Sequence, residues 1–188
     1  AGEVVALGEG ASEEYGLAIG DHAVSEQIVP CGRCRFCRNG RHWMCHQHDI
    51  YGFKKERAEG AWAEYVRLPA NALNYKVPKE IPPEHAALVE PLGCAIHAVE
   101  RGDIRLGDTV AIAGMGPIGL CMLQVARQKG PGMLIALDAL PRRLELARAL
   151  GADLAIDVRD GTAVQQVLDL TEGYGCDVYI EATGAAAG

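Results

Sequence analysis

The sequence predicts an α/β protein with a β-rich first half and a second half built on a parallel sheet. Three observations lead to this class. Short apolar runs punctuated by glycine and proline fill the first half, and these are typical of short strands. From Leu106 onward, strands alternate with helices, which indicates βαβ units. A glycine-rich turn, Gly114–Gly119, stands at the first strand-to-helix junction of that second half.

In the first half, hydrophobic runs between prolines predict four strands, and a helical pattern follows Pro82. We expect Pro91 to end or kink this first helix, because proline interrupts helical hydrogen bonding, and a second helix to follow. The expected strands are Glu3–Leu7, Ala23–Val29, Ala63–Leu68 and Leu73–Val77, and the expected helices are Glu84–Glu90 and Leu92–Arg101.

The second half alternates regularly between the two element types. The expected strands are Thr109–Ala113, Met133–Leu137, Leu154–Ile156 and Asp177–Ile180; the expected helices are Pro117–Lys129, one from Pro141 to Gly151, and Ala163–Leu170. The boundary is placed in the helical region between the halves, giving domains 1–95 and 96–188.

Composition and charge exclude several classes of protein. With 49% hydrophobic residues the 188-residue chain is globular, and a net charge of −7 argues against a protein built mainly to bind nucleic acid. The charge is uneven, because residues 31–57 carry +5 and the remainder −12. The longest uncharged run, residues 109–126, is broken by glycines, so no membrane segment is expected. Without a visible targeting segment, we expect a cytoplasmic protein.

Four of the seven cysteines follow the pattern Cys31-x2-Cys34-x2-Cys37-x7-Cys45. Four thiolates so close in sequence can close a tetrahedral Zn²⁺ site of the structural kind, which leaves no position for substrate. Nearby arginines favour the thiolate form. Three alternatives stay open: an iron–sulfur cluster, although its usual spacing differs; plain buried or redox cysteines; and a zinc module that binds nucleic acid.

The second motif is Gly114-Met-Gly116-Pro117-Ile118-Gly119, a G-x-G-x-x-G between an expected strand and helix. Such glycines allow a tight turn, the approach of a pyrophosphate and close helix–strand packing. Phosphates would then lie at the helix N-terminus. Asp138 follows nineteen residues after Gly119, where a carboxylate can bind the adenosine ribose of NAD. The alternative is a glycine-rich turn in a doubly wound domain that binds no NAD.

Glu90 precedes Pro91, so we expect its backbone to leave helical geometry and its carboxylate to be exposed at a break between helices. A carboxylate at such a break can face a cleft, and the alternative, which the sequence alone favours, is a solvated surface glutamate. His97 is expected to be packed rather than a ligand. We expect His42, His46, His48 and His85 to be surface or lobe residues, of which His46 and His48 could shield the metal but are not needed to bind it.

Together, the cysteine cluster and the glycine turn resemble the zinc-dependent medium-chain alcohol dehydrogenase family. Further similar segments are Glu3–Gly8, Gly20–Asp21, Val29–Gly32, Gly60–Tyr65, Glu90–Gly93, Gly107–Asp108 and Glu181–Gly184. The Glu90-Pro-Leu segment resembles the polyol and threonine dehydrogenase branch. Cys45–Lys54 and Asn74–Pro78 are similar to the members that act on erythritol or threitol.

The resemblance implies a GroES-like catalytic domain with a structural zinc lobe, a Rossmann domain, and a cleft between them with a catalytic zinc. It implies hydride transfer from a secondary alcohol to NAD, in a dimer or tetramer. Cys31, Cys34, Cys37 and Cys45 match the structural-zinc ligands. The loop Gly114, Gly116, Pro117, Ile118 and Gly119 matches the pyrophosphate loop, Asp138 the ribose acid and Arg143 its basic neighbour. Glu90 matches a catalytic-zinc ligand or a residue bonded to the zinc-bound water.

The resemblance also places the family's remaining catalytic-zinc ligands before Ala1 and its last Rossmann strands after Gly188. We therefore expect this chain to hold structural zinc and part of NAD, without a complete catalytic metal site. A threonine-type dehydrogenase is the alternative within enzymes, and a zinc-knuckle and nucleotide-binding module without catalysis is the alternative outside them.

Overall fold

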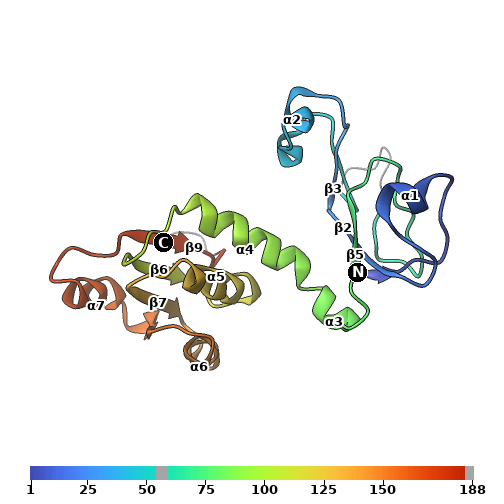
Figure 1. The fold of residues 1–188 in the computed structure, drawn as a ribbon. Helices are drawn as coiled ribbons and strands as arrows, with labels where there is room; N and C mark the ends of the chain where they lie inside the picture. The colour runs from blue at the N-terminus through green and yellow to red at the C-terminus, as the bar shows by residue number, and fades with distance from the viewer. Residues whose placement is uncertain (54–58, 185–188) are drawn as a thin grey trace. The chain divides into compact units, whose positions relative to one another are not determined.

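The computed structural model describes residues 1–53 and 59–184. These residues form two compact units, the first comprising Ala1–Val89 and the second beginning at Glu90 (Figure 1). Part of the basic segment expected from the sequence, residues 54–57, lies outside the described residues.

The first unit contains two small antiparallel sheets. Strand β2 (His22–Ser25) lies between β1 (Gly2–Glu3) and β5 (Asn74–Val77), and β3 (Ile28–Val29) pairs with β4 (Asp49–Ile50). Its short helices are α1 (Ala11–Tyr15), α2 (Arg35–Arg38), η1 (His42–Met44) and α3 (Pro83–Ala86).

The expected strands of this unit are partly wrong. The expected strand Ala23–Val29 is divided, because Ser25 pairs with Asn74 in one sheet whereas Ile28 pairs with Ile50 in the other. The chain therefore changes sheets at Glu26–Gln27. The expected strand Ala63–Leu68 is not formed, and its residues from 63 to 67 are exposed.

The expected break at Pro91 is also wrong. Helix α4 spans Val89–Arg101 without interruption, and the break between helices lies earlier, in the turn at Ala87 and Leu88 that follows α3. Pro91 is the third residue of α4, within the first turn, where a backbone N–H has no partner inside the helix. The missing N–H of proline therefore removes no helical bond. Glu90 and the expected packed residue His97 both lie on α4, and both are exposed.

The second unit is a four-stranded parallel sheet in the order β8-β7-β6-β9, as the sequence predicts for a doubly wound sheet. The strands are β6 (Thr109–Ala113), β7 (Met133–Asp138), β8 (Leu154–Asp157) and β9 (Val178–Glu181). The connections contain α5 (Pro117–Gln128), α6 (Pro141–Ala149), the single turn η2 (Val158–Asp160) and α7 (Ala163–Leu170).

The two faces of this sheet have separate cores, because successive side chains of a strand point to opposite faces. On one face, Val110, Ile112 and Leu134 pack with residues of α4, α5 and α6. On the other face, Ala111, Ile135 and Val167 of α7 pack together. Helices thus cover both faces, which makes the sheet doubly wound and explains why its central strands, β6 and β7, are almost continuously apolar.

Two glycines fix the junction between β6 and α5. Gly114 has φ of +90°, and a Cβ there would lie 2.7 Å from the peptide joining Ala182 and Thr183. A Cβ on Gly119 would lie 1.7 Å from the carbonyl oxygen of Gly114. At Gly116, by contrast, a Cβ would meet no atom within 4 Å. Gly114 and Gly119 are therefore required for packing, whereas Gly116 faces open space.

This difference predicts losses of stability of different size for two similar substitutions. Gly119→Ala should lower the free energy of unfolding by about 3 kcal/mol or more, because backbone must move to admit the methyl group. Gly116→Ala should cost at most about 1 kcal/mol, since its φ of −75° suits any residue. Urea denaturation followed by circular dichroism measures both, and a Gly119→Ala midpoint equal to that of the wild type would contradict the packing argument.

Candidate functional site

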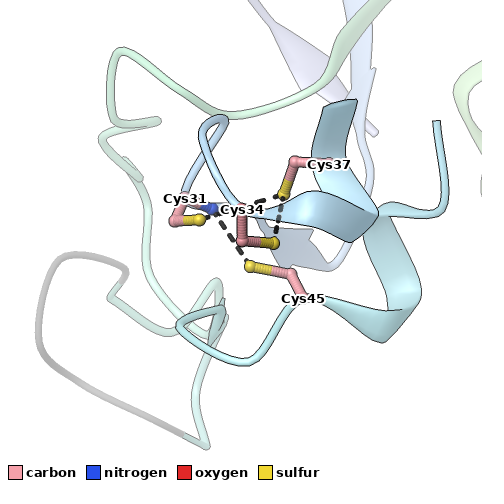
Figure 2. A group of neighbouring side chains, drawn as sticks. All are labelled: Cys31, Cys34, Cys37 and Cys45. Carbon is pink, nitrogen blue, oxygen red and sulfur yellow. Dashed lines mark hydrogen bonds between the residues drawn. The ribbon is translucent and has the colours of Figure 1, made fainter. Parts of the chain in front are cut away.

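The four cysteines expected to bind metal come together in the first unit. Cys31 and Cys34 precede helix α2, Cys37 lies on it, and Cys45 directly follows η1 (Figure 2). The ligand atoms of the four residues all lie within 4.8 Å of one another. Among the described residues, this is the one group of three or more Cys, His, Asp or Glu side chains placed to hold a metal ion.

The spacing of the sulfurs fits a tetrahedral zinc site. The Cys31 and Cys37 Sγ atoms are 3.9 Å apart, and those of Cys34 and Cys37 are 3.5 Å apart. Four thiolates around one Zn²⁺ would lie about 3.8 Å from each other, given a Zn–S distance of about 2.3 Å. The donor set and its spacing therefore suit a closed structural zinc site.

Backbone amides surround the thiols on one side of the cluster. The Cys31 amide donates to Cys45 Sγ at 3.3 Å, and the amides of Arg33 and Cys34 lower the pKa of the Cys31 thiol to about 6. Amide bonds, chiefly from Cys37, also lower the pKa of Cys34. Burial instead raises the pKa of the Cys37 thiol to about 12. A bound cation would favour the thiolate form of the cysteines that it contacts.

Other side chains near the cysteines contact the segment that carries them, and they do not belong to the group placed to bind a metal. The His48 Nδ1 hydrogen-bonds to the carbonyl oxygen of Cys45, and the His46 ring packs edge-on against Phe36 with centroids 5.1 Å apart. Side chains that carry positive charge are exposed around the lobe: Arg33, Arg35, Arg38 and Arg41.

The glycine loop, residues Gly114–Gly119, lies at the carboxyl end of β6 in the second unit. Gly116 is the N-cap of α5, and Pro117 is its first residue, where proline suits the helix start. The amides of the first turn have no partners within a helix and, with the helix dipole, favour a negatively charged group. The open space at Gly116 therefore gives an anion access to backbone amides, which fits a dinucleotide pyrophosphate.

Asp138 ends the neighbouring strand β7, and its side chain is nearly buried, at 5% exposure. Its Oδ2 accepts from the Met115 amide at 2.7 Å, and its Oδ1 accepts from the Leu140 amide at 2.8 Å. Arg143 Nη1 lies 3.6 Å from Oδ2. The sequence places Asp138 and Arg143 near the glycine loop, but its motif gives no sign that the carboxylate bonds to the loop itself.

Glu90, the expected catalytic residue, is exposed in the first turn of α4. Its Oε1 accepts a hydrogen bond from Cys94 Sγ, one turn later, at 3.5 Å. Glu90 belongs to the second unit, and the four cysteines belong to the first.

A carboxylate that motif analysis did not single out lies beside the glycine loop. Glu181 ends β9 and pairs in register with Ala113 of β6. It accepts from the Tyr179 hydroxyl at 2.7 Å and from the Thr183 amide at 2.6 Å, which holds the turn that packs on Gly114. Only the pairing of β9 with β6, which is not a local sequence signal, brings Glu181 to this position.

Protein-family models match both the first and the second half of the chain. Residues 1–79 match the alcohol dehydrogenase GroES-like domain, and residues 117–188 match the zinc-binding dehydrogenase model. The chain belongs to the zinc-dependent alcohol dehydrogenase family. The family confirms the partial GroES-like and Rossmann folds that the resemblance implied.

Curated relatives match along nearly the whole chain. It is 52% identical over 183 residues to the erythritol/L-threitol dehydrogenase of Mycolicibacterium smegmatis, covering 97% of this chain and 50% of that protein. It is 40% identical over 185 residues to the L-threonine 3-dehydrogenase of Pyrococcus horikoshii, covering 98% and 51% respectively. The chain thus spans about half the length of these relatives.

Solved structures show the same architecture. A zinc-binding dehydrogenase from Sinorhizobium meliloti, bound to NADP, matches with a TM-score of 0.82 and 32% identity over 98% of this chain and 53% of its own. An alcohol dehydrogenase from Escherichia coli, in complex with NADH, matches with a TM-score of 0.81 and 29% identity, over 98% and 52%. Within residues 1–53 and 59–184, no helix has the length and hydropathy of a membrane span.

The cysteine cluster generates a metal prediction. Cys45→Ser should remove bound Zn²⁺ and unfold the surrounding lobe, because a structural zinc supplies folding free energy that few apolar residues here can replace. The second unit should stay folded, since its core is separate. Elemental analysis gives the zinc content, and hydrogen exchange locates the unfolding.

Cys176→Ser is the matched control, because Cys176 packs beside the sheet of the second unit and lies outside the cluster. This control should retain zinc. Iron with sulfide in the wild-type protein, or zinc retained by Cys45→Ser, would contradict the assignment.

Proposed function

We propose that this chain is part of a zinc-dependent oxidoreductase that transfers a hydride from a secondary alcohol to NAD and forms a ketone. We propose a polyol of the erythritol or threitol type as substrate. The 52% identity to an erythritol/L-threitol dehydrogenase along nearly the whole chain carries this proposal. The 40% identity to a threonine 3-dehydrogenase makes threonine the second candidate. Nothing in the comparisons favours a module without catalysis.

In this proposal the glycine loop binds the coenzyme pyrophosphate. The open space at Gly116 and the unpaired first-turn amides of α5 support this role, as does Ile118 at the second helical position. Asp138 faces the adenosine ribose through lone pairs not engaged by backbone amides, with Arg143 beside it. Each carboxylate oxygen can accept about two hydrogen bonds, so the two observed amide bonds leave acceptors for ribose hydroxyls.

The metals have different tasks in this proposal. Cys31, Cys34, Cys37 and Cys45 hold structural zinc, which ties α2 and η1 together. A catalytic zinc, when bound in the complete enzyme, supplies a Lewis acid that stabilises the substrate alkoxide. The contribution of this chain to that second site is Glu90, whose exposed carboxylate in the first turn of α4 is available to a metal or to a water bound to it.

We also propose a cytoplasmic homo-oligomer, either a dimer or a tetramer. The seven cysteines of this chain, all of them among the described residues, form no disulfide bonds, which suits a reducing compartment. The family resemblance supports the assembly into oligomers.

A chimera tests the proposed reaction. Residues 1–184 of this chain would replace the matching half of the M. smegmatis relative. We expect the chimera to reduce NAD with erythritol or threitol, at higher kcat/KM than with sorbitol or threonine. Glu90→Ala in the chimera should lower kcat by about 10–100-fold, as for a residue that supports a metal ligand or water.

The 188-residue chain alone should show no turnover with these alcohols, because a catalytic zinc needs about three protein ligands. Preference for threonine in the chimera would favour the second candidate. Turnover by the chain alone, above that of its own Glu90→Ala variant, would show that the active site is misplaced.

Coenzyme choice follows from Asp138. We expect kcat/KM of the chimera to be at least about tenfold higher with NAD than with NADP, because a buried carboxylate repels a 2′-phosphate and tenfold requires only about 1.4 kcal/mol. Arg143 is already beside Asp138 and compensates that carboxylate rather than the phosphate. Initial rates with both coenzymes measure the ratio, and equal values would refute the preference.

A further inference from the structure

The carboxylate of Asp138 is tied to the glycine loop before any ligand binds. Strands β6 and β7 run parallel with Ala113 opposite Leu137, so the loop after β6 and the end of β7 meet at one edge of the sheet. There the Gly114 amide donates to the Leu137 carbonyl at 2.7 Å, and the next amide, of Met115, donates to Asp138 Oδ2 at 2.7 Å. The end of β7 thus binds two consecutive amides of the loop.

The Met115 amide depends on this acceptor. Met115 is fully buried, and its side chain belongs to the core of the sheet. A buried N–H that loses its acceptor keeps the full cost of its desolvation. The second bond, from the Leu140 amide, is only partly buried, so losing it costs less. The two bonds therefore differ in importance, and the one to Met115 matters more.

The same bond determines which loop amides remain for a ligand. With the Gly114 and Met115 amides directed to β7, the chain turns so that Gly116 faces open space and α5 begins at Pro117. On the opposite side, the peptide between Ala182 and Thr183 packs against Gly114. The loop is therefore held from β7 on one side and from β9 on the other.

We propose that Asp138 is a positioning residue for the glycine loop, separate from any contact with ribose. It fixes the Met115 peptide and so presents the following amides to a pyrophosphate. This inference rests on the proposed dinucleotide binding. It means that Asp138 affects the affinity for a phosphate ligand that has no ribose at all.

The experiment uses inorganic pyrophosphate and NADH as probes of the purified protein and its variants. Asp138→Ala removes both acceptors, and Asp138→Leu removes them with less change in volume. Asp138→Asn keeps one acceptor oxygen, which should turn to the buried Met115 amide. Asp157→Ala is the matched control, because Asp157 ends β8 in register with Asp138 and bonds to Arg159 rather than to the loop.

Two measurements are made on each protein. Hydrogen exchange followed by NMR reports the Met115 amide without ligand, and titration reports the Kd of each probe. In the wild type, the Met115 amide should be protected, unlike the amide of Ile118 in the first turn of α5. In Asp138→Ala and Asp138→Leu, we expect lost protection and at least about tenfold weaker binding of both pyrophosphate and NADH.

Asp138→Asn should retain Met115 protection and pyrophosphate binding while its affinity for NADH falls, and Asp157→Ala should match the wild type in every measurement. If asparagine preserves pyrophosphate binding where alanine and leucine do not, the effect comes from the hydrogen bond to the Met115 amide. Thermal unfolding of each variant checks that a general loss of stability is not the cause.

Three results would overturn the inference. The first is a wild-type protein in which the Met115 amide exchanges as fast as the Ile118 amide. This measurement does not depend on whether any variant folds. The second is unchanged pyrophosphate binding in Asp138→Ala or Asp138→Leu with only NADH weakened, which would leave Asp138 as a ribose acceptor alone. The third is lost Met115 protection in Asp138→Asn. If the wild type protects Met115 but binds neither probe, the proposed dinucleotide binding fails instead.

Discussion

The packing of the second unit depends on Gly114 and Gly119, which carry no side chains at the junction between β6 and α5. The Cα of Gly119 approaches the Gly114 carbonyl so closely that a single methyl group has no room. This approach sets the distance between helix and strand, and through them the packing of α5 on the core. Gly114 has a second neighbour, the peptide after β9, so that three chain segments meet at one glycine. The site at this edge of the sheet follows from that crowding.

The fold of the second unit was predictable from local sequence, whereas that of the first was predictable only in part. Strands such as Thr109–Ala113 are buried on both faces, so continuous apolar runs bounded by glycine identify them. In the first unit, the division of Ala23–Val29 depends on which partners its two ends find, Asn74 or Ile50. Such pairings are not encoded by any short pattern, and neither is the position of α4 relative to Pro91.

The candidate site was also predictable only in part. The four cysteines lie within one short segment, and their spacing alone indicates that they meet. For Asp138, the motif indicates its place at the end of a strand but not the direction of its oxygens. That direction is set by the Met115 amide, on a different strand connection, and by the Leu140 amide beyond β7. Glu181 shows the same limit, since it reaches the loop through strand pairing.

The closeness of the cysteines along the chain has a consequence for synthesis on the ribosome. All four thiols leave the ribosomal exit tunnel once enough residues have been added after Cys45. By contrast β5, the later of the two partner strands of β2, begins only at Asn74. Domains generally fold in order from the N-terminus during translation, and local contacts form faster than distant ones. Metal can therefore be captured by the nascent chain before its sheet closes. The lobe would then be ordered before β5 pairs with β2, and complete before the codons for the glycine loop are read.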